Sequence, residues 1–188
     1  CKGRQTVFSS VAYLLGYLWA DGWVSDKTNM VSMSLKHEDG VAIKPLVDWT
    51  GEWAQSNRSN RSFPMLEFRV TDRRFNALLR GLGYRDKSRV SADQVCAYLG
   101  DQLVPYFVHG FFDGDGTIVR SKTGQRMVSF AGPFDYDWTH MRSLLSEKGI
   151  TTTVVRQEKK TGGRSSMLRF TDRLQVIRFY RAFIHGHP

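Results

Sequence analysis

The pattern of apolar and polar residues predicts a helix and then a hairpin near the start of the chain. Over residues 8–21 it favours a helix, which we expect to begin at Ser9 or Ser10 and to stop at Gly22. Residues 23–36 alternate around a polar Asp-Lys-Thr-Asn segment, which is typical of two antiparallel strands joined by a turn.

Three further elements are predicted in the first half. Residues 41–53, with the sequence VAIKPLVDWTGEW, favour a helix in which Pro45 lies in the first turn or produces a kink. A strand is predicted over residues 63–70 and another helix over 71–83. That helix has two candidate caps and two candidate ends, Thr71 or Asp72 and Gly81 or Gly83.

The second half repeats this order. Helices and strands are predicted over 103–115, 117–121, 126–131, 134–148, 151–158, 165–170 and 172–185. Between the halves, SADQVCAYLG at 91–100 predicts a short helix capped by Ser91 and Gln94. The order indicates a mixed α/β (α+β) fold of two αββαββα halves with antiparallel sheets. We therefore divide the chain into residues 1–90, a linker at 91–101, and residues 102–188.

Two pairs of similar segments support an internal duplication. LLGYLWADG at 14–22 resembles VHGFFDGDG at 108–116, and 94 positions separate Asp21 from Asp115. Later in each half, MLEFRVTDRRFNALLR and SMLRFTDRLQVIRFYR share Thr-Asp-Arg, and 100 positions separate Thr71 from Thr171. Both pairs keep their order, and one longer hairpin in the second half accounts for the difference in spacing.

Small residues four positions apart mark one face of each motif helix. They are Gly16 and Ala20 in the first copy, and Gly110 and Gly114 in the second. Residues at this spacing share a helix face, so each helix offers a strip on which another backbone can approach closely. Packing the two strips together brings the helix ends, and with them Asp21 and Asp115, to one place. Aromatic residues beside the strips, and those in or just before the last helix of each half, are expected in the core: Tyr17, Trp19, Phe75, Phe111, Phe112, Phe170, Phe179 and Tyr180.

Two carboxylates at helix C-termini repel each other and the partial negative charge of the helix ends. A divalent cation beside Asp21 and Asp115 would relieve this repulsion, and oxygen ligands favour Mg²⁺ or Mn²⁺. A single Asp-Gly is more often a helix-ending turn, but two copies in a duplicated frame favour the metal site. DGDGTI does not fit a calcium loop, because Phe111 and Lys122 would stand where carboxylates are required.

The two nine-residue motifs resemble those of the LAGLIDADG homing endonucleases of the single-chain type, and the order of elements extends the resemblance over nearly the whole chain. The resemblance implies saddle-shaped sheets that lie in the DNA major groove. It also implies a monomer that hydrolyses phosphodiester bonds in both strands of a long double-stranded DNA target, across the minor groove, with a divalent metal and 3′ overhangs. Intron homing would be the biological role.

The resemblance also assigns roles to individual residues. Asp21 and Asp115 occupy the metal-binding motif position, and we assign the metal site to them with the preceding Ala20 and Gly114. Lys36 or His37, and Lys87 or Arg89, match the basic or polar residues that assist catalysis in the family, and we select Lys36 and Lys87. The second half departs from this pattern, which raises the expectation of preferential nicking of one strand. Its counterparts are about Ala131, Gly132 and His187, with Arg120 or Lys122 as substitutes.

Contacts to DNA are expected from polar side chains on the strands and neighbouring loops, since a β-ribbon fits the major groove. The segments 55–62 and 156–166 have loop composition and several positive charges suited to phosphate contacts. The candidates are Asn29, Ser32, Ser34, Lys36, Arg58, Arg61, Arg69, Arg120, Lys122, Gln125, Arg126, Arg156, Gln157, Arg164 and Arg169.

Composition agrees with a nucleic-acid partner. The 188 residues include 27 Lys and Arg against 18 Asp and Glu, a formal net charge of +9. Cys1 and Cys96 lack the spacing of a zinc site or a disulfide framework, and the sequence contains neither a membrane span nor a signal peptide. We expect a soluble intracellular protein, in the cytoplasm or nucleoid of a bacterial or phage host or in an organelle. Because CKGRQTV and HGHP do not fit an intein, we expect a free-standing or intron-encoded product.

Two other functions remain open. The same fold without cleavage would serve an RNA maturase or a DNA-binding regulator, and a duplicated metal-binding or interaction module would need no nucleic acid. Retention of both Asp21 and Asp115 favours the nuclease.

Overall fold

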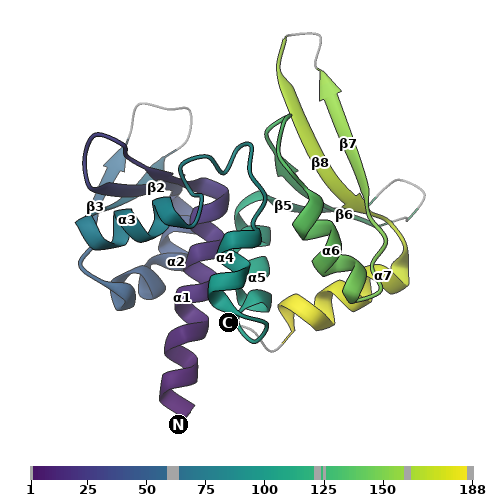
Figure 1. Ribbon diagram of the computed structural model, residues 1–188, viewed down its shortest axis with the longest axis horizontal. Helices are drawn as coiled ribbons and strands as arrows, with labels where there is room; N and C mark the ends of the chain where they lie inside the picture. Colours follow the sequence, from purple (N-terminus) through teal and green to yellow (C-terminus); the bar gives the residue numbers. More distant parts are fainter. Residues whose placement is uncertain (1, 59–63, 121–123, 125, 159–161, 186–188) are drawn as a thin grey trace.

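A computed structural model describes residues 2–58, 64–120, 124, 126–158 and 162–185 of the protein (Figure 1). The first half contains α1 (Lys2–Asp21), β1 (Gly22–Val24), β2 (Met30–Lys36), α2 (His37–Thr50), β3 (Ala54–Arg58), β4 (Met65–Thr71) and α3 (Arg73–Gly81). After the linking helix α4 (Asp93–Leu99), the second half contains α5 (Val104–Asp115), β5 (Gly116–Arg120), β6 (Arg126–Gly132), α6 (Thr139–Glu147), β7 (Thr153–Glu158), β8 (Arg164–Phe170), α7 (Arg173–Phe179) and the π-helical η1 (Tyr180–Ile184). The predicted α+β fold with two αββαββα halves is confirmed.

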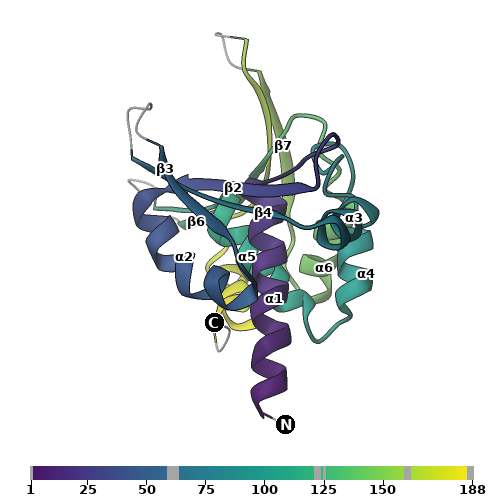
Figure 2. The ribbon, with the colours of Figure 1, turned by 90° about the vertical axis from the view of Figure 1, so that its left-hand side faces the viewer.

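The two sheets have equivalent topologies. Their strand orders are β1-β2-β4-β3 and β5-β6-β8-β7, and every neighbouring pair is antiparallel. In the first sheet α2 packs against β2 and β4, and in the second α5 and α7 pack against β6. Strands β2 and β4 lie across the top of α1 and α2 in Figure 2. The helices thus cover one face of each sheet, and we call the opposite face the outer face.

Helices α1 and α5 join the halves through backbone contact, and α1 lies directly in front of α5 in Figure 2. A Cβ atom on Gly16 would lie 1.9 Å from the carbonyl oxygen of Phe107, and one on Gly110 would lie 1.9 Å from that of Tyr13. A Cβ on Gly114 would lie 2.4 Å from Cβ of Ala20. The predicted small-residue strips therefore face each other, and they do so without room for larger side chains.

One apolar core runs through both halves and across this helix pair. Tyr17, Trp19, Phe111 and Phe112 are buried as predicted. Tyr180, predicted to be in the core, is 52% exposed, so that prediction is wrong. It begins the π-helical segment, in which Phe183 supplies the buried ring instead.

Several predicted helix boundaries are corrected by tertiary packing. Helix α1 begins at Lys2, so Ser9 and Ser10 are not its caps but buried residues within it. Pro45 lies inside α2, well past the first turn, because the helix begins at His37. Helix α6 begins at Thr139, because the preceding residues form a loop that buries Tyr136 and Trp138.

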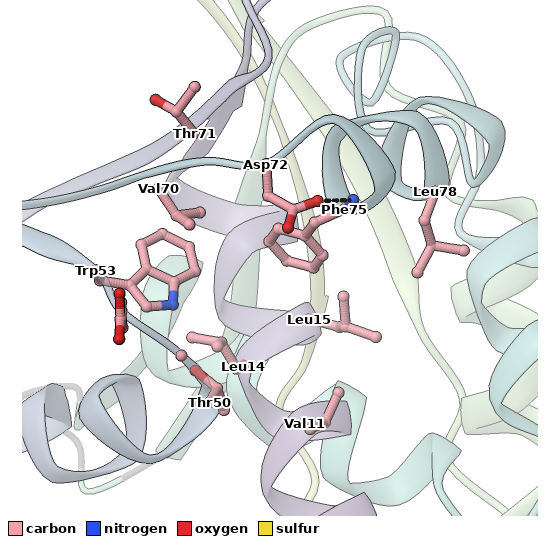
Figure 3. Close-up of a pocket in the computed structure, with 12 residues that line it drawn as sticks. Val11, Leu14, Leu15, Thr50, Trp53, Val70, Thr71, Asp72, Phe75 and Leu78 are labelled. Atoms are coloured by element: carbon pink, nitrogen blue, oxygen red, sulfur yellow. Dashed lines mark hydrogen bonds between the residues drawn. The ribbon is translucent and has the colours of Figure 1, made fainter.

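The capping predictions have mixed outcomes. Asp72 caps α3, since its carboxylate accepts a hydrogen bond of 2.8 Å from the Phe75 amide, drawn in Figure 3. The turn after α3 uses Gly83, whose φ of +88° suits glycine. The N-cap of α4 is Ala92, without a side-chain cap bond, so the predicted Ser91–Gln94 pair is wrong. Ser91 Oγ instead accepts a 3.3 Å bond from the Asp93 amide.

The predicted αββαββα order requires a strand between α2 and β4, but no residues were assigned to it. Residues 54–58 fall in a polar segment of loop composition, yet they pair along β4 from Ala54–Arg69 to Arg58–Met65. An edge strand needs few apolar residues when its neighbour supplies the hydrogen bonds. In the second half, strands β7 and β8 likewise extend into the predicted loop 156–166. Residues 59–62 and 159–161 of the two predicted loops lie outside the described residues.

Among the described residues, no helix has the length and apolar character needed to cross a membrane.

Candidate metal and nucleic-acid site

The two motif acids lie at the paired ends of α1 and α5. Asp21 is the last residue of α1, and Asp115 is the last residue of α5. Gly114 brings α5 close to the first acid, because a Cβ at this position would lie only 3.5 Å from Asp21 Oδ2. Asp21 is exposed and Asp115 is half-buried, so the place where the halves meet presents both carboxylates to a ligand.

Each acid is held in a setting that disfavours its charge. Burial, together with the charge of Asp21, raises the pKa of Asp115 to about 6, although Lys87 acts in the opposite direction. Partial desolvation also raises the pKa of Asp21; Lys87 opposes this shift and Asp39 adds to it. A cation would relieve this crowding of negative charge.

Lys87 reaches the site from the turn that follows α3. Its ammonium donates hydrogen bonds to the carbonyl oxygens of Leu18 (3.0 Å) and Ala20 (2.7 Å) at the end of α1. Burial lowers the pKa of Lys87 to about 8, while Asp115 and Asp21 act to raise it. A cation at a helix C-terminus also neutralises the partial charge of the free carbonyls. Lys87 therefore both closes α1 and lies within electrostatic reach of both acids.

A cavity of about 70 Å³ adjoins Asp115 and Lys87. Trp19 and Tyr136 line it, and the Trp19 indole donates a 2.8 Å hydrogen bond to the Tyr136 hydroxyl. Backbone and small side chains at 131–133 complete the wall. The space exceeds what one water molecule needs, and the nearby charges provide hydrogen-bond partners.

The donors suit a hard divalent cation. The two carboxylates, and the carbonyls of Ala20 and Gly114 that precede them in the chain, would make an all-oxygen set. One lone pair of the Ala20 carbonyl is engaged by Lys87. Within the described ranges, no group of three or more His, Cys, Asp or Glu side chains is arranged to hold a metal. Mg²⁺ commonly binds through one or two carboxylates and takes its remaining ligands from water and substrate phosphates, so the pair is sufficient.

The register corrects the predicted counterparts of Lys36 and His37. Ser34 pairs with Glu67 and Ala131 with Met167, so Ala131 corresponds to Ser34, and Pro133 to Lys36. Pro133 lines the cavity beside Asp115. The second half still has no basic residue here, because Phe134 takes the place of His37.

The other predicted basic residues are less closely tied to the acids. Lys36 is exposed at the end of β2, and among the described residues it forms no hydrogen bond or ion pair with either acid. Arg89 is exposed, and its amide donates to the Asp86 carbonyl in the turn after α3. Arg120 is exposed at the end of β5. Lys122 and His187 lie outside the described residues.

Asp39, Ser88 and Tyr136 were missed from the sequence. Asp39 acts on Asp21 from the first turn of α2, and Ser88 and Tyr136 line the cavity. Asp39 follows Lys36 by three positions, so a residue in this segment was selected from the sequence, but Asp39 itself was not. Ser88 directly follows Lys87, whereas Tyr136 lies in a segment expected to be helical and had no local pattern to mark it.

A polar cluster, formed by Tyr13, His109 and Asp113, joins α1 to α5 at positions that precede the motif acids. The Tyr13 hydroxyl donates a 2.6 Å hydrogen bond to Asp113 Oδ2, and His109 Nε2 lies 3.4 Å from the same oxygen. The rings of Tyr13 and His109 meet edge to face, with centroids 5.3 Å apart. Burial and the bond to Asp113 raise the pKa of Tyr13, so the phenol stays protonated.

Several of the predicted DNA contacts lie on the outer faces of the sheets. Residues directly opposite each other on neighbouring strands share a face. The register with Arg69 and Arg169, and the alternation along each strand, place on the outer faces Ser32, Ser34, Lys36, Arg69, Gln157 and Arg169.

The remaining candidates lie elsewhere. Asn29 is exposed in the turn before β2, and Arg120 pairs with Arg126 at the hairpin end. Arg156 Nε donates a 3.1 Å hydrogen bond to the Phe134 carbonyl, and Arg164 stacks on the Phe134 ring at 3.8 Å. The side chain of Arg58 and the residues Arg61, Lys122 and Gln125 lie outside the described residues.

A larger hollow, of about 530 Å³, lies between α1, the end of α2 and α3 (Figure 3). Trp53, Phe75, Leu14 and Leu15 point into it. None of the predicted site residues lines this hollow, so the polar chemistry of the molecule is concentrated at the ends of the motif helices.

Comparison of the sequence with protein families identifies one domain. Residues 103–183 match the family model of the LAGLIDADG-like domain. This range contains the second motif with Asp115, whereas the first motif lies before it. No curated protein sequence matches the chain.

Solved structures share the fold at low sequence identity. The homing endonuclease I-DmoI, in complex with DNA and Mn, is 15% identical with a TM-score of 0.62, over 97% of this chain and 99% of that chain. Full-length DUF199/WhiA from Thermatoga maritima is 13% identical with a TM-score of 0.64, over 97% of this chain and 56% of that chain. A mutant of I-SmaMI is 14% identical with a TM-score of 0.57, over 92% and 84%. The whole chain therefore has the LAGLIDADG fold.

Proposed function

Because the chain carries a LAGLIDADG-like domain and has the fold of the homing endonuclease I-DmoI, we propose that it is a site-specific DNA endonuclease. It hydrolyses phosphodiester bonds of a long double-stranded target and uses Mg²⁺ or Mn²⁺. The observation that carries this proposal is the pair of acids, one from each half, at the ends of the two packed helices. The net charge of +9 suits a polyanionic substrate, and the chain acts as a monomer because it contains both halves of the site.

Asp21 and Asp115 hold the metal, with the carbonyls of Ala20 and Gly114 as further oxygen donors. A divalent metal held there would supply a Lewis acid for the scissile phosphate and would favour ionisation of a bound water molecule. Lys87 fixes the end of α1 through its bonds to Leu18 and Ala20, and its charge favours the ionised form of both acids. Lys87 is thus a positioning residue in the free protein.

The asymmetry around the acids supports unequal cleavage of the two strands. In this proposal Lys36 contacts a phosphate in the first half, whereas its counterpart Pro133 carries no charge. The cavity beside Asp115 supplies room for ordered water on that side. We therefore expect the two strands to be cut at different rates, with nicked DNA as an intermediate.

Solved complexes of I-DmoI support the choice of ligands for the proposal. They include complexes with DNA and Mn, with DNA and Ca, and with target DNA in the presence of Mg. Because the sequence identity is 15%, these complexes describe the ions bound by I-DmoI. The carboxylate oxygens of Asp21 and Asp115 are the independent reason to expect the same class of ion in this chain.

The decisive experiment is cleavage of a library of long duplex targets with Mg²⁺, followed by sequencing of the cut ends. Asp21→Asn and Asp115→Asn should each abolish cutting while binding persists, because they remove metal ligands and leave the outer faces intact. Asp101→Asn is the matched control, since this exposed acid lies before α5 and away from both motif ends. Absence of any site-specific cut or nick by the wild-type chain contradicts the proposal.

A DNA-binding regulator or an RNA maturase on the same fold is the second candidate. The match to DUF199/WhiA, which has the highest TM-score of the structures described above, favours it, because this fold also occurs in proteins that are not described as endonucleases. Filter binding separates the alternatives. Tight binding to a folded intron RNA or to a specific duplex, without cutting in Mg²⁺ or Mn²⁺, would replace the endonuclease by this second function.

A further inference from the structure

Glu67 and Arg69 form an ion pair on the outer face of β4, a central strand of the first sheet. Across β2, β4 and β3, the register aligns Ser32, Arg69 and Ala54 in one row. The adjacent row on the same face contains Ser34, Glu67 and Ser56. On these three strands the neighbours are small, so Glu67 and Arg69 are the only long side chains there. On β1, Trp23 continues the first row beyond Ser32.

The two side chains differ in access to solvent. Glu67 is 5% exposed, which is low for a carboxylate on a face that no helix covers. Arg69 Nη2 donates a 2.5 Å hydrogen bond to Glu67 Oε2, and the Arg69 side chain is 39% exposed. The Glu67 carboxylate is therefore buried against the sheet, and the Arg69 guanidinium is the part of the pair that a ligand can reach.

The remaining donors of Arg69 suit a planar acceptor pair. Among the described residues Nε has neither a partner nor solvent access, and Nη2 gives one hydrogen to Glu67. The hydrogens of Nη1 and the second hydrogen of Nη2 remain. A guanine in the major groove presents O6 and N7, which accept two parallel hydrogen bonds from an arginine.

The second half repeats the arginine without the acid. Its equivalent rows contain Ser129, Arg169 and Thr153, and then Ala131, Met167 and Val155. Arg169 thus occupies the position of Arg69, while Met167 replaces Glu67. The chain therefore contains its own comparison between a supported and an unsupported arginine.

We propose that Arg69, held by Glu67, recognises a guanine in one half of the DNA target, and that Arg169 selects its base less strictly because Met167 cannot hold it. This inference rests on the proposed binding of DNA to the outer faces. Glu67 acts as a positioning residue: it fixes the guanidinium before DNA arrives, so less conformational entropy is lost on binding. It also cancels the charge of Arg69, which reduces attraction to phosphates in general and leaves recognition of the base.

The test is selection of bound duplexes from randomised DNA, with EDTA present so that cleavage does not contribute. Arg69→Ala and Arg169→Ala identify the base pair that each arginine contacts. At the Arg69 position, the wild-type chain should prefer guanine by on the order of tenfold to a hundredfold, and at the Arg169 position by less. Arg69→Ala should remove the first preference and leave the second.

Exchange of the supporting residues tests the role of the acid. Glu67→Met should reduce the guanine preference at the first position to that of the second, while affinity for random DNA increases because a negative charge is lost. Met167→Glu should produce the opposite changes at the second position. Glu67→Leu, which also removes the hydrogen-bond acceptor, provides the same test if the methionine variant does not fold, as judged by thermal denaturation.

Three results would overturn the inference. Equal guanine preference at both positions in the wild-type chain would show that Glu67 has no effect. An unchanged preference in folded Glu67→Met or Glu67→Leu would show the same. A uniform loss of affinity in Arg69→Ala, for all sequences, would make Arg69 a phosphate contact. In each case DNA is still bound, whereas failure of the proposed function appears separately as absence of any selected sequence or of any cut.

Discussion

Substitution of Gly16 by alanine tests whether backbone contact between α1 and α5 holds the molecule together. The added Cβ would lie 1.9 Å from the Phe107 carbonyl oxygen, and Cβ contacts below 3.0 Å essentially do not occur. The two helices must therefore separate locally by at least the difference, about 1.1 Å. The obstructing groups are the Phe107 carbonyl and the Phe111 amide nitrogen, which are both backbone, so no side-chain rotation relieves the overlap.

The magnitude follows from two opposing effects. Overpacking of a close-packed interior costs about 1–3 kcal/mol, and a backbone obstacle places Gly16→Ala near the upper limit. Alanine recovers about 1 kcal/mol through its higher helix propensity. We expect a net loss of about 2 kcal/mol in the free energy of unfolding, which lowers the Tm by about 4–8 °C for a chain of this size.

Thermal and urea denaturation measure this effect, and Gly81→Ala is the matched control. Gly81 ends α3, and a Cβ there meets no atom within 4 Å. This control should leave stability unchanged or raise it by up to about 1 kcal/mol. Gly16→Ala should also reduce cleavage, because separation of the helices moves Asp21 relative to Asp115. A Gly16→Ala variant as stable as Gly81→Ala would refute the backbone-contact argument.

Three further predictions concern the charges at the site. In metal-free buffer the raised pKa of Asp115 stabilises the fold below about pH 4, and this stabilisation is lost as the pH rises through about 6. Asp115→Asn should therefore be more stable than the wild type at pH 7, by on the order of 2 kcal/mol in urea denaturation. Equal stability of the two proteins would contradict the assigned pKa. Divalent metal should raise the Tm of the wild type, with about 2.7 kcal/mol gained at a hundredfold excess over Kd, and calorimetry should show no such gain for Asp115→Asn. Lys87→Met removes a charge that lowers the pKa of both acids, so the pH at which cleavage begins should move upward; an unchanged pH profile would remove Lys87 from the electrostatics of the site.

The architecture and the place of the acids could be predicted because duplication doubles each local pattern. Gly16 and Gly110 stand at corresponding positions, and either alone would be an ordinary helix glycine. Lys87 was also placed correctly beside the acids, by resemblance of the segment around it.

The errors occur where distant parts of the chain override local preference. Strand β3 has polar composition and exists because β4 pairs with it. Helix α1 continues through Ser9 and Ser10, since burial of these residues matters more than their preference for helix ends. Asp39 raises the pKa of Asp21 because α2 folds back toward the end of α1. The spacing of the two residues in the sequence gives no sign that they lie close together.

The glycine contact between α1 and α5 is reciprocal. Gly16 faces the carbonyl three residues before Gly110, that of Phe107, and Gly110 faces the carbonyl three residues before Gly16, that of Tyr13. A contact of this form is satisfied equally by two copies of either half. At this point the interface thus has the local twofold symmetry of a contact between two identical helices, although the two helices differ in sequence. Chimeras that join either half to a half of another two-motif protein should assemble whenever the partner keeps a glycine at this position.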